Sequence, residues 1–320
     1  MMRFAPILLG FMLCAPIWAD EPHPGAEAFV ERAVAEHGLD PELVRAVLAD
    51  ARYQQAIIDA ITRPAESRPW YEYRPIFLTE SRIASGAEFW LAHRDLLEAV
   101  SERFGVPVEI IVAIVGVETN YGGNTGRYRV IDALATLGFY FPRRAAFFSS
   151  ELGHFLSLAD EEGLPIYEVL GSYAGAMGIG QFISSSYRAY AVDFDGDERR
   201  DLWRSLPDAL GSVANYLARH GWNRGEALVL SVSSVPGDVE PSPGLRPNFT
   251  LGELETQGVT IERSGQDDQT PVTLIELETE DGSEHWVGLN NFHVITRYNR
   301  SPLYAMAVTQ LAEAIRARVP

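Results

Sequence analysis

Residues 106–123, VPVEIIVAIVGVETNYGG, constrain this chain most, because they place one carboxylate at the end of an otherwise apolar helix. Residues 108–117 are apolar on nearly every side, so a helix here is expected to be buried on most of its faces. Pro107 suits the first helical turn, where its missing N–H costs nothing, and Gly122-Gly123 is expected to end the helix. The sequence therefore predicts a core built around this helix, with Glu118 in its last turn.

The position of Glu118 favours the protonated form of its side chain. The last turn of a helix exposes carbonyl oxygens that disfavour negative charge, and a neighbouring apolar wall would desolvate a carboxylate. An acid that stays protonated near neutral pH is what general acid catalysis of glycosidic bond cleavage requires. From this helix alone, the alternative of a helix-end Glu that points into water stays open.

Length and charge limit the classes of protein that this chain can belong to. Its 320 residues suffice for one large domain or for two to three smaller ones. Hydrophobic residues make up 47% and charged residues 22%, as in ordinary globular proteins. The net charge of −18 argues against a nucleic-acid partner, because a phosphate backbone would be repelled.

The N-terminus has the pattern of an export signal. An early Arg precedes an apolar run over residues 4–18, which predicts a signal peptide of residues 1–19 that is cleaved after Ala19. The run is too short to favour a spanning helix. Cys14 is the only cysteine, and Leu13 stands where a lipoprotein signal needs a small residue. We therefore expect a soluble exported protein, with an outer-membrane lipoprotein acylated at Cys14 as the less favoured alternative.

The rest of the chain combines a helical majority with one strand-rich part. Apolar residues at helical spacing predict helices, and a loop rich in proline and aromatic residues is expected over residues 63–75. The expected helices cover residues 26–37, 41–60, 81–104, 130–137, 143–158, 208–220 and 303–318. Short β-branched runs within residues 226–288, with the turn signal Asp281-Gly282, predict a small antiparallel β-unit inserted into a helical protein.

Six segments carry the most specific signal in the chain. In order they read GVETNYG, ALATLGFYFPRRAAFFSSEL, GSYAGAMGIGQF, DFDGD, GSVANYLARHGW and NNFHVITRYN. Together they resemble the lytic murein transglycosylases of the membrane-bound B type, relatives of lysozyme that cleave peptidoglycan without water. The resemblance extends over nearly all of the predicted mature chain, in the same order, so it is far more specific than any single motif.

The resemblance implies a mainly α (α+β) fold. A lysozyme-like helical core would be flanked by a helical N-terminal domain and by a small antiparallel β domain inserted before the C-terminal helix. On this basis the expected parts are the signal peptide 1–19, a helical domain 20–105, a catalytic core 106–222 with an EF-hand-like loop at 193–208, a β domain 223–289 and a C-terminal return to the core 290–320.

The resemblance also implies roles for single residues. Glu118 would be the one catalytic acid and base. A sugar-binding groove would be lined by Tyr73, Arg144, Ser172, Gln181, Tyr216, Tyr298, Asn299 and Tyr304. From composition alone, the tyrosines are equally consistent with core packing, Arg144 with a surface ion pair, and the glycines of residues 171–180 with tight helix packing.

An acidic loop predicts a metal site. Asp193, Asp195 and Asp197 occupy the first, third and fifth positions of an EF-hand-like calcium loop, and the carbonyl of Arg199 would be the seventh-position ligand. The loop departs from the usual pattern, since Glu198 replaces the usual Gly and Arg204 the usual bidentate Glu. The resemblance implies that Asp208 closes the site, with Asp201 as a second candidate. The alternative is a solvated acidic turn; a bound Ca²⁺ would be structural, and no organic cofactor is expected.

The expected activity is cleavage of the β-1,4 bond between N-acetylmuramic acid and N-acetylglucosamine in peptidoglycan, with a 1,6-anhydromuramoyl product. One alternative is a hydrolytic muramidase, in which a second carboxylate such as Asp132 or Glu151 activates water. The other is a non-catalytic peptidoglycan-binding scaffold, against which the intact Glu118 argues. Glycan strands in the periplasm and other cell-wall enzymes are the expected partners, and the sequence does not give the oligomeric state.

Overall fold

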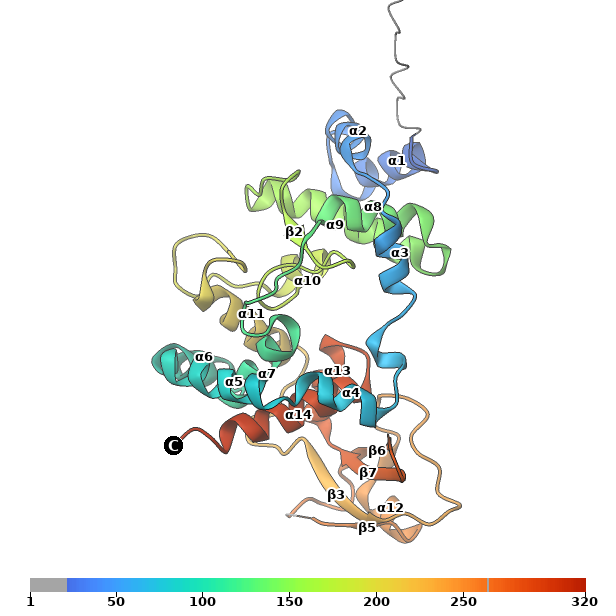
Figure 1. Ribbon diagram of the computed structural model, residues 1–320, viewed down its shortest axis with the longest axis vertical. Helices are drawn as coiled ribbons and strands as arrows, with labels where there is room; N and C mark the ends of the chain where they lie inside the picture. Colours follow the sequence, from blue (N-terminus) through green and yellow to red (C-terminus); the bar gives the residue numbers. More distant parts are fainter. Residues whose placement is uncertain (1–21, 264) are drawn as a thin grey trace, which may run out of the picture.

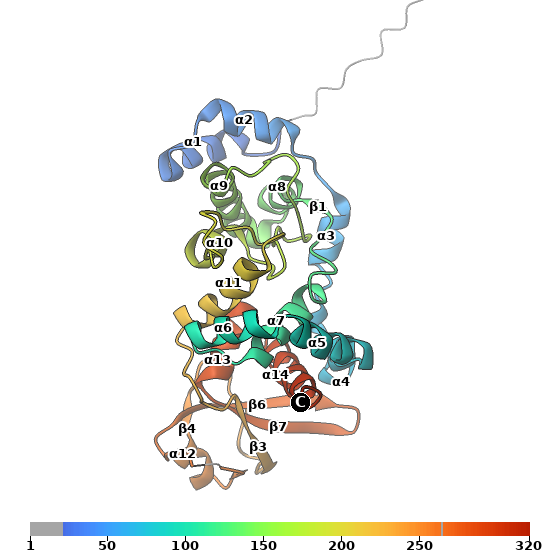
Figure 2. The same ribbon diagram turned by 90° about the vertical axis from the view of Figure 1, so that its left-hand side faces the viewer.

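The structure is a computed structural model that describes residues 22–263 and 265–320, so the predicted signal peptide and Cys14 lie outside the described residues. Figures 1 and 2 show an upper helical lobe, a lower helical lobe and a β-unit, stacked along the longest axis of the molecule. Within the described residues, no helix combines the length and the apolar character that a membrane crossing demands.

The upper lobe is formed by six helices, in which α8 and α9 pack against each other and against the N-terminal helices. Its helices are α1 (Ala26–His37), α2 (Pro41–Asp50), α3 (Gln55–Ile61), α8 (Val130–Tyr140), α9 (Ala145–Glu161) and α10 (Ser184–Tyr190). The 3-10 turn η2 (Pro142–Arg144) joins α8 to α9, and a two-stranded antiparallel ladder pairs β1 (Tyr128–Arg129) with β2 (Leu170–Gly171).

The lower lobe is built around α7 (Val108–Thr119), of which ten residues are buried. Helices on several sides exclude water from α7, as its apolar sequence predicts. These are α5 (Glu80–Ala92), α6 (Arg94–Phe104), α11 (Leu206–Arg219) and α14 (Pro302–Arg316). The 3-10 turn η1 (Ala65–Ser67), α4 (Trp70–Phe77) and α13 (Asn290–Tyr298) complete the lobe. Helix α11 also contacts α10, so it joins the lobes.

The β-unit is a five-stranded antiparallel sheet with the strand order β4-β6-β7-β3-β5. Its elements are β3 (Val229–Ser234), β4 (Phe249–Thr250), the short helix α12 (Leu251–Thr256), β5 (Thr260–Ile261), β6 (Pro271–Thr279) and β7 (Gly282–Gly288). It has its own apolar core, which includes Leu230, Leu254 and Val287. The prediction of an antiparallel β-unit is confirmed, but the hairpin turn is Glu280-Asp281, because Thr279 already pairs with Gly282.

Three sequence predictions of helix bounds are wrong. The expected helix 81–104 is two helices that meet at His93, whose φ of −121° is not helical. The expected helix 41–60 is interrupted after Asp50, because the N–H groups of Arg52 and Gln54 donate to side chains of α8. The aromatic segment expected as a loop contains η1 and α4 instead. In the second case tertiary contacts override the local pattern.

Candidate active site

Helix α7 ends at Thr119, three residues before the glycine pair that was expected to stop it. Asn120 takes the left-handed conformation with a φ of 51°, and its N–H donates to the carbonyl of Gly116. Asn tolerates this conformation better than most residues, so it ends the helix without a glycine. The Thr119 hydroxyl donates to the carbonyl of Ile179 at 2.8 Å. The end of α7 is thereby fixed to the glycine-rich segment of residues 171–182.

Glu118 is partly exposed in the last turn of α7, and its carboxylate accepts a hydrogen bond from the Tyr304 hydroxyl at 2.6 Å. The pKa of Glu118 is raised to about 7, chiefly because burial penalises the charged form. The hydrogen bond from Tyr304 opposes this shift, and the negative charge of Glu66 adds to it. Near neutral pH the side chain can therefore both donate and accept a proton, as an acid-base catalyst must.

Tyrosines from three helices surround Glu118. Tyr73 of α4, Tyr298 of α13 and Tyr304 of α14 all have raised pKa values, caused first by burial and then in part by the charges of neighbouring acids, Glu118 among them. They therefore remain neutral donors at neutral pH. The Tyr298 hydroxyl donates to the carbonyl of Gly180 at 2.6 Å, which joins α13 to the glycine-rich segment.

Tyr216 lies behind this group. Its ring is 4.9 Å from that of Tyr298, and its hydroxyl donates to the carbonyl of Arg297 at 2.5 Å. Because Tyr216 is buried and its hydroxyl is already bonded to the backbone, it supports Tyr298 from α11. The pKa of Tyr216 is raised to about 12 by burial.

The glycine-rich segment brings two further predicted residues to the same region. Ser172 Oγ accepts from the N–H groups of Ala174 and Ala176, at 3.3 and 3.1 Å, and so holds a turn. Gln181 has a φ of 52°, and its Nε2 donates to backbone carbonyls. Within the described residues, Gln181 Oε1 makes no hydrogen bond and remains free to accept one from a ligand. A Cβ at Gly126 would lie 2.0 Å from the carbonyl carbon of Gly171, so the two backbones meet too closely for a side chain.

Two predicted residues make contacts that the sequence could not indicate. Arg144 is exposed in η2, with its guanidinium over the rings of Phe147 and Phe148 at 4.3 and 4.9 Å, so its contacts join it to α9 and not to Glu118. Asn299 donates from Nδ2 to Glu66 Oε1 at 3.0 Å. The sequence analysis did not single out Glu66, because in the loop expected over residues 63–75 it assigned a role to Tyr73 alone.

The two acids considered as a second catalytic carboxylate are engaged elsewhere. Asp132 is buried and pairs with Arg129 at 2.6 Å, besides accepting from the backbone of Arg52. Glu151 is buried and accepts from the N–H and the hydroxyl of Ser185. Both carboxylates therefore stabilise the upper lobe. Neither is among the groups that shift the pKa of Glu118, whereas Glu66 is.

Four acids of the EF-hand-like loop lie together. Oxygen atoms of Asp193, Asp195, Asp197 and Asp208 lie within 4.8 Å of one another. Among the described residues, none of these four forms an ion pair with an arginine or a histidine. Burial raises the pKa of Asp208, and the charge of Asp195 adds to this effect. Such a cluster of oxygen ligands suits Ca²⁺, which would offset the mutual repulsion of the acids.

The loop keeps the calcium-loop shape despite its departures. Glu198 takes a φ of 69°, so it adopts the left-handed turn that glycine usually provides. The N–H of Arg199 donates to Asp197 at 2.9 Å. Asp208, and not Asp201, joins the cluster, because Asp201 accepts from the N–H groups of Trp203 and Arg204.

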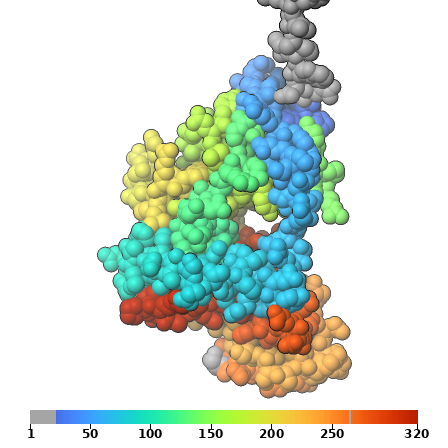
Figure 3. All heavy atoms as spheres, in the orientation of Figure 1, coloured from blue at the N-terminus to red at the C-terminus, as the bar shows by residue number. Residues whose placement is uncertain are grey.

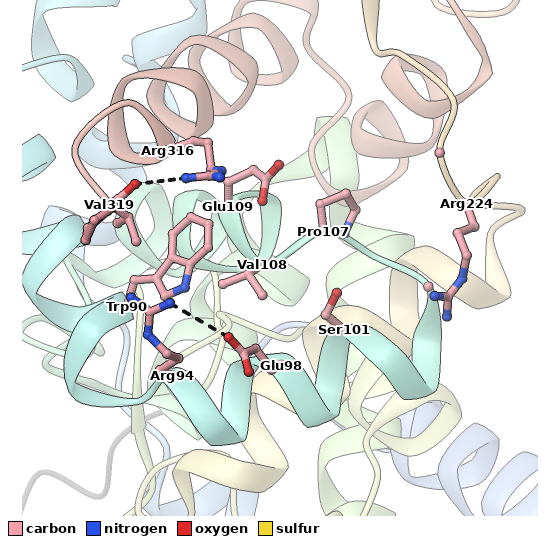
Figure 4. Close-up of a pocket in the computed structure, with 13 residues that line it drawn as sticks. Trp90, Arg94, Glu98, Ser101, Pro107, Val108, Glu109, Arg224, Arg316 and Val319 are labelled. Atoms are coloured by element: carbon pink, nitrogen blue, oxygen red, sulfur yellow. Dashed lines mark hydrogen bonds and ion pairs between the residues drawn. The ribbon is translucent and has the colours of Figure 1, made fainter.

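A separate pocket lies at the other end of α7 (Figure 4). It has a volume of about 440 Å³, and its lining includes Trp90, Arg94, Glu98 and Arg316. Arg94 pairs with Glu98 at 3.9 Å, and Arg316 donates to the carbonyl of Val319. At 1.5 Å per residue, ten residues of helix separate this end from Glu118 by about 15 Å. The pocket is therefore not part of the candidate active site.

The sequence matches the transglycosylase SLT domain over residues 22–313. The chain belongs to the lytic transglycosylase family. This transglycosylase is 40% identical over 304 residues to membrane-bound lytic murein transglycosylase B of Escherichia coli (strain K12). The aligned region covers 92% of this chain and 83% of that protein.

Solved structures agree with this assignment. The soluble lytic transglycosylase SltB1 from Pseudomonas aeruginosa is 47% identical, with a TM-score of 0.84 over 92% of this chain and 99% of that one. The Escherichia coli lytic transglycosylase Slt35 in complex with calcium is 40% identical, with a TM-score of 0.83 over 92% and 93%. The predicted family and the mainly α (α+β), lysozyme-like fold of this transglycosylase are thereby confirmed.

Proposed function

We propose that this protein cleaves the β-1,4 bond between N-acetylmuramic acid and N-acetylglucosamine in peptidoglycan, with Glu118 as its single acid and base. The observation that carries the proposal is the setting of Glu118, at the end of a buried helix, bonded to Tyr304, with a pKa of about 7. A pKa raised towards neutrality makes both roles accessible to one group near pH 7.

In the proposed reaction, Glu118 donates its proton to the glycosidic oxygen as the bond to C1 of the muramoyl residue breaks. The 2-acetamido oxygen of the same sugar stabilises the positive charge at C1. Glu118, now a carboxylate, takes the proton from the C6 hydroxyl, whose oxygen closes the 1,6-anhydro ring. The nucleophile belongs to the substrate and is held close to C1, which favours ring closure over attack by water.

The other predicted residues are proposed to bind the sugars. The free Oε1 of Gln181 is suited to accept from an acetamido N–H. Tyr73, Ser172, Tyr216, Tyr298 and Tyr304 are proposed to line the groove. Tyr304 also orients the acid, and Tyr216 packs against Tyr298. Asn299 and Arg144 are proposed to contact the glycan, Arg144 at a more distant subsite.

The proposal extends to the location of the protein, its partners, its domain division and a calcium site. We propose that the protein acts in the periplasm after export, with glycan strands as substrate and other cell-wall enzymes as partners. The domain division at residues 105, 222 and 289 is retained as part of this proposal. A structural Ca²⁺ is proposed at Asp193, Asp195, Asp197 and Asp208, with the carbonyl of Arg199, supported by the acidic cluster and by the calcium complex of the related Slt35.

The test is digestion of purified sacculi followed by mass spectrometry of the products. Anhydromuramoyl fragments, each lighter than the hydrolysis product by one water, are expected from the wild type. Glu118→Gln should bind glycan without turnover, whereas Glu72→Gln, which removes an exposed carboxylate of α4, should cleave normally. Reducing-end muramic acid would establish the muramidase alternative, and binding without any product from the wild type would establish the scaffold alternative.

A further inference from the structure

A carboxylate outside the predicted set faces the candidate active site. Glu66 lies in η1, on the segment that joins α3 of the upper lobe to α4 of the lower lobe. In Figure 3 a hollow separates the two lobes, with this blue segment along one side and part of the red C-terminal region visible at its base. Glu66 is partly buried, so its charge is only partly screened by water.

Glu66 is hydrogen-bonded to the segment that joins the helices of Tyr298 and Tyr304. Glu66 Oε1 accepts from Asn299 Nδ2 at 3.0 Å. Asn299 directly follows Tyr298, and its carbonyl accepts from the N–H of Ser301 at 2.8 Å. Ser301 is the N-cap of α14, and its hydroxyl accepts from the N–H of Tyr304. The bond to Glu66 therefore fixes the short connection between the two helices whose tyrosines contact Gly180 and Glu118.

We propose that Glu66 is a positioning residue for the reaction: its carboxylate holds Asn299 in place and contributes to the electrostatic environment of Glu118. This inference rests on the proposed function of Glu118. It gives the site a second carboxylate that neither attacks the sugar nor activates water.

The electrostatic effect of Glu66 on Glu118 is inferred from the titratable groups around Glu118. Tyr73 from α4, Tyr298 from α13 and Tyr304 from α14 are neutral tyrosines, of which Tyr304 donates to the carboxylate. Burial is the main cause of the raised pKa of Glu118, and Glu66 from η1 is the charged group that adds to it. Burial raises the pKa values of Tyr73 and Tyr173, and the charge of Glu66 adds to both shifts.

Two substitutions separate the charge of Glu66 from its hydrogen bond, and a third serves as the control. Glu66→Gln keeps a carbonyl oxygen for the Asn299 amide and removes only the charge. Glu66→Ala removes both. Glu72→Gln, six residues along the chain, removes an exposed carboxylate that makes no side-chain hydrogen bond within the described residues, and it is the matched control.

The first measurement is a titration of Glu118 by NMR, with ¹³C-labelled Glu and the resonance assigned by its loss in Glu118→Gln. We expect the pKa of Glu118 to fall by roughly half a unit or more in both Glu66 variants, and to stay unchanged in Glu72→Gln. This readout requires no turnover, so it tests the role of Glu66 even if the proposed reaction proves wrong. An unchanged titration in Glu66→Gln overturns the proposal.

The second measurement is the pH dependence of kcat/KM on soluble peptidoglycan fragments. Because the acid must be protonated, the alkaline limb should move to lower pH in Glu66→Gln by the same amount as the titration, with KM unchanged. Glu66→Ala should show the same shift together with a raised KM, since Asn299 is released. If Glu66→Gln instead abolishes turnover at every pH, and the wild type yields reducing ends, Glu66 is a base for water and the proposal is wrong.

Discussion

Replacing Glu118 by Gln should stabilise the folded protein at alkaline pH while it removes activity. In the folded state the pKa of Glu118 is about 7, and its ordinary value is 4.5. The folded protein therefore binds this proton more tightly than the unfolded chain does. The stability that Glu118 contributes is fully present below about pH 4.5 and is lost as the pH rises through 7.

The magnitude follows from the same values. A difference of 2.5 pKa units, from 4.5 to about 7, corresponds to about 3.4 kcal/mol at 1.36 kcal/mol per unit. Glu118 is partly exposed, so water screens part of this cost and roughly 2 kcal/mol is the expected effect. Gln cannot ionise, and its Oε1 can still accept the hydrogen bond from Tyr304, so the variant avoids this cost.

Urea denaturation of the wild type and of Glu118→Gln, at pH values from 4 to 8 and constant calcium, measures the difference. The titration of all other acids cancels in the comparison of the two proteins. The variant should be about equal to the wild type at pH 4 and more stable by roughly 2 kcal/mol at pH 8. Glu72→Gln should show no such rise. A difference between Glu118→Gln and wild type that stays constant with pH would refute the argument that burial sets the acid strength of Glu118.

Three other perturbations have definite expected results. Tyr304→Phe removes the hydroxyl that donates to the ionised form of Glu118. Such a bond contributes about 1.5–3 kcal/mol, so the alkaline limb of the pH-rate profile should move to higher pH by about one unit or more. A limb at the wild-type pH would contradict this. Calcium at a hundredfold over its Kd should add about 2.7 kcal/mol to the free energy of unfolding. A chelator should therefore lower the Tm of the wild type but not that of Asp195→Asn. An equal Tm of the wild type with and without chelator would argue against the site. Gly126→Ala should lower the free energy of unfolding, measured by urea denaturation, by about 2 kcal/mol or more. In Gly163→Ala the new Cβ meets nothing within 4 Å, so the loss should be about 1 kcal/mol. Equal losses in the two variants would contradict the close approach of Gly126 to Gly171.

The sequence could predict α7 and the position of Glu118 because both depend on local information. A run of apolar residues can be recognised without knowing what covers it, and the coverage on several sides of α7 agrees with that run. The acidic loop was recognisable for the same reason, because three of its four clustered acids lie within five residues. The β-unit was recognisable from its β-branched runs, although the turn of the hairpin was displaced by one residue.

What the sequence could not predict depends on contacts between distant segments. The break before α3 exists because Asp132 and Thr136, about 80 residues away, accept from the backbone of Arg52 and Gln54. Glu66 was missed for the same reason, since the one side chain bonded to it in the described part of the chain is Asn299, 233 residues further along. No local period or motif contains information of this kind.

The acid strength of Glu118 is the clearest case of such dependence, because it is the sum of three effects that do not all act in the same direction. Burial by α7 and its neighbours raises the pKa, Glu66 raises it further, and Tyr304 lowers it. Position in the last helical turn predicts only the direction of the first effect. A helix end alone could hold either a strong acid exposed to water or a weak acid in an apolar wall. Burial decides in favour of the weak acid, and residues from segments 65–67 and 298–304, which lie far apart in the sequence, adjust its strength.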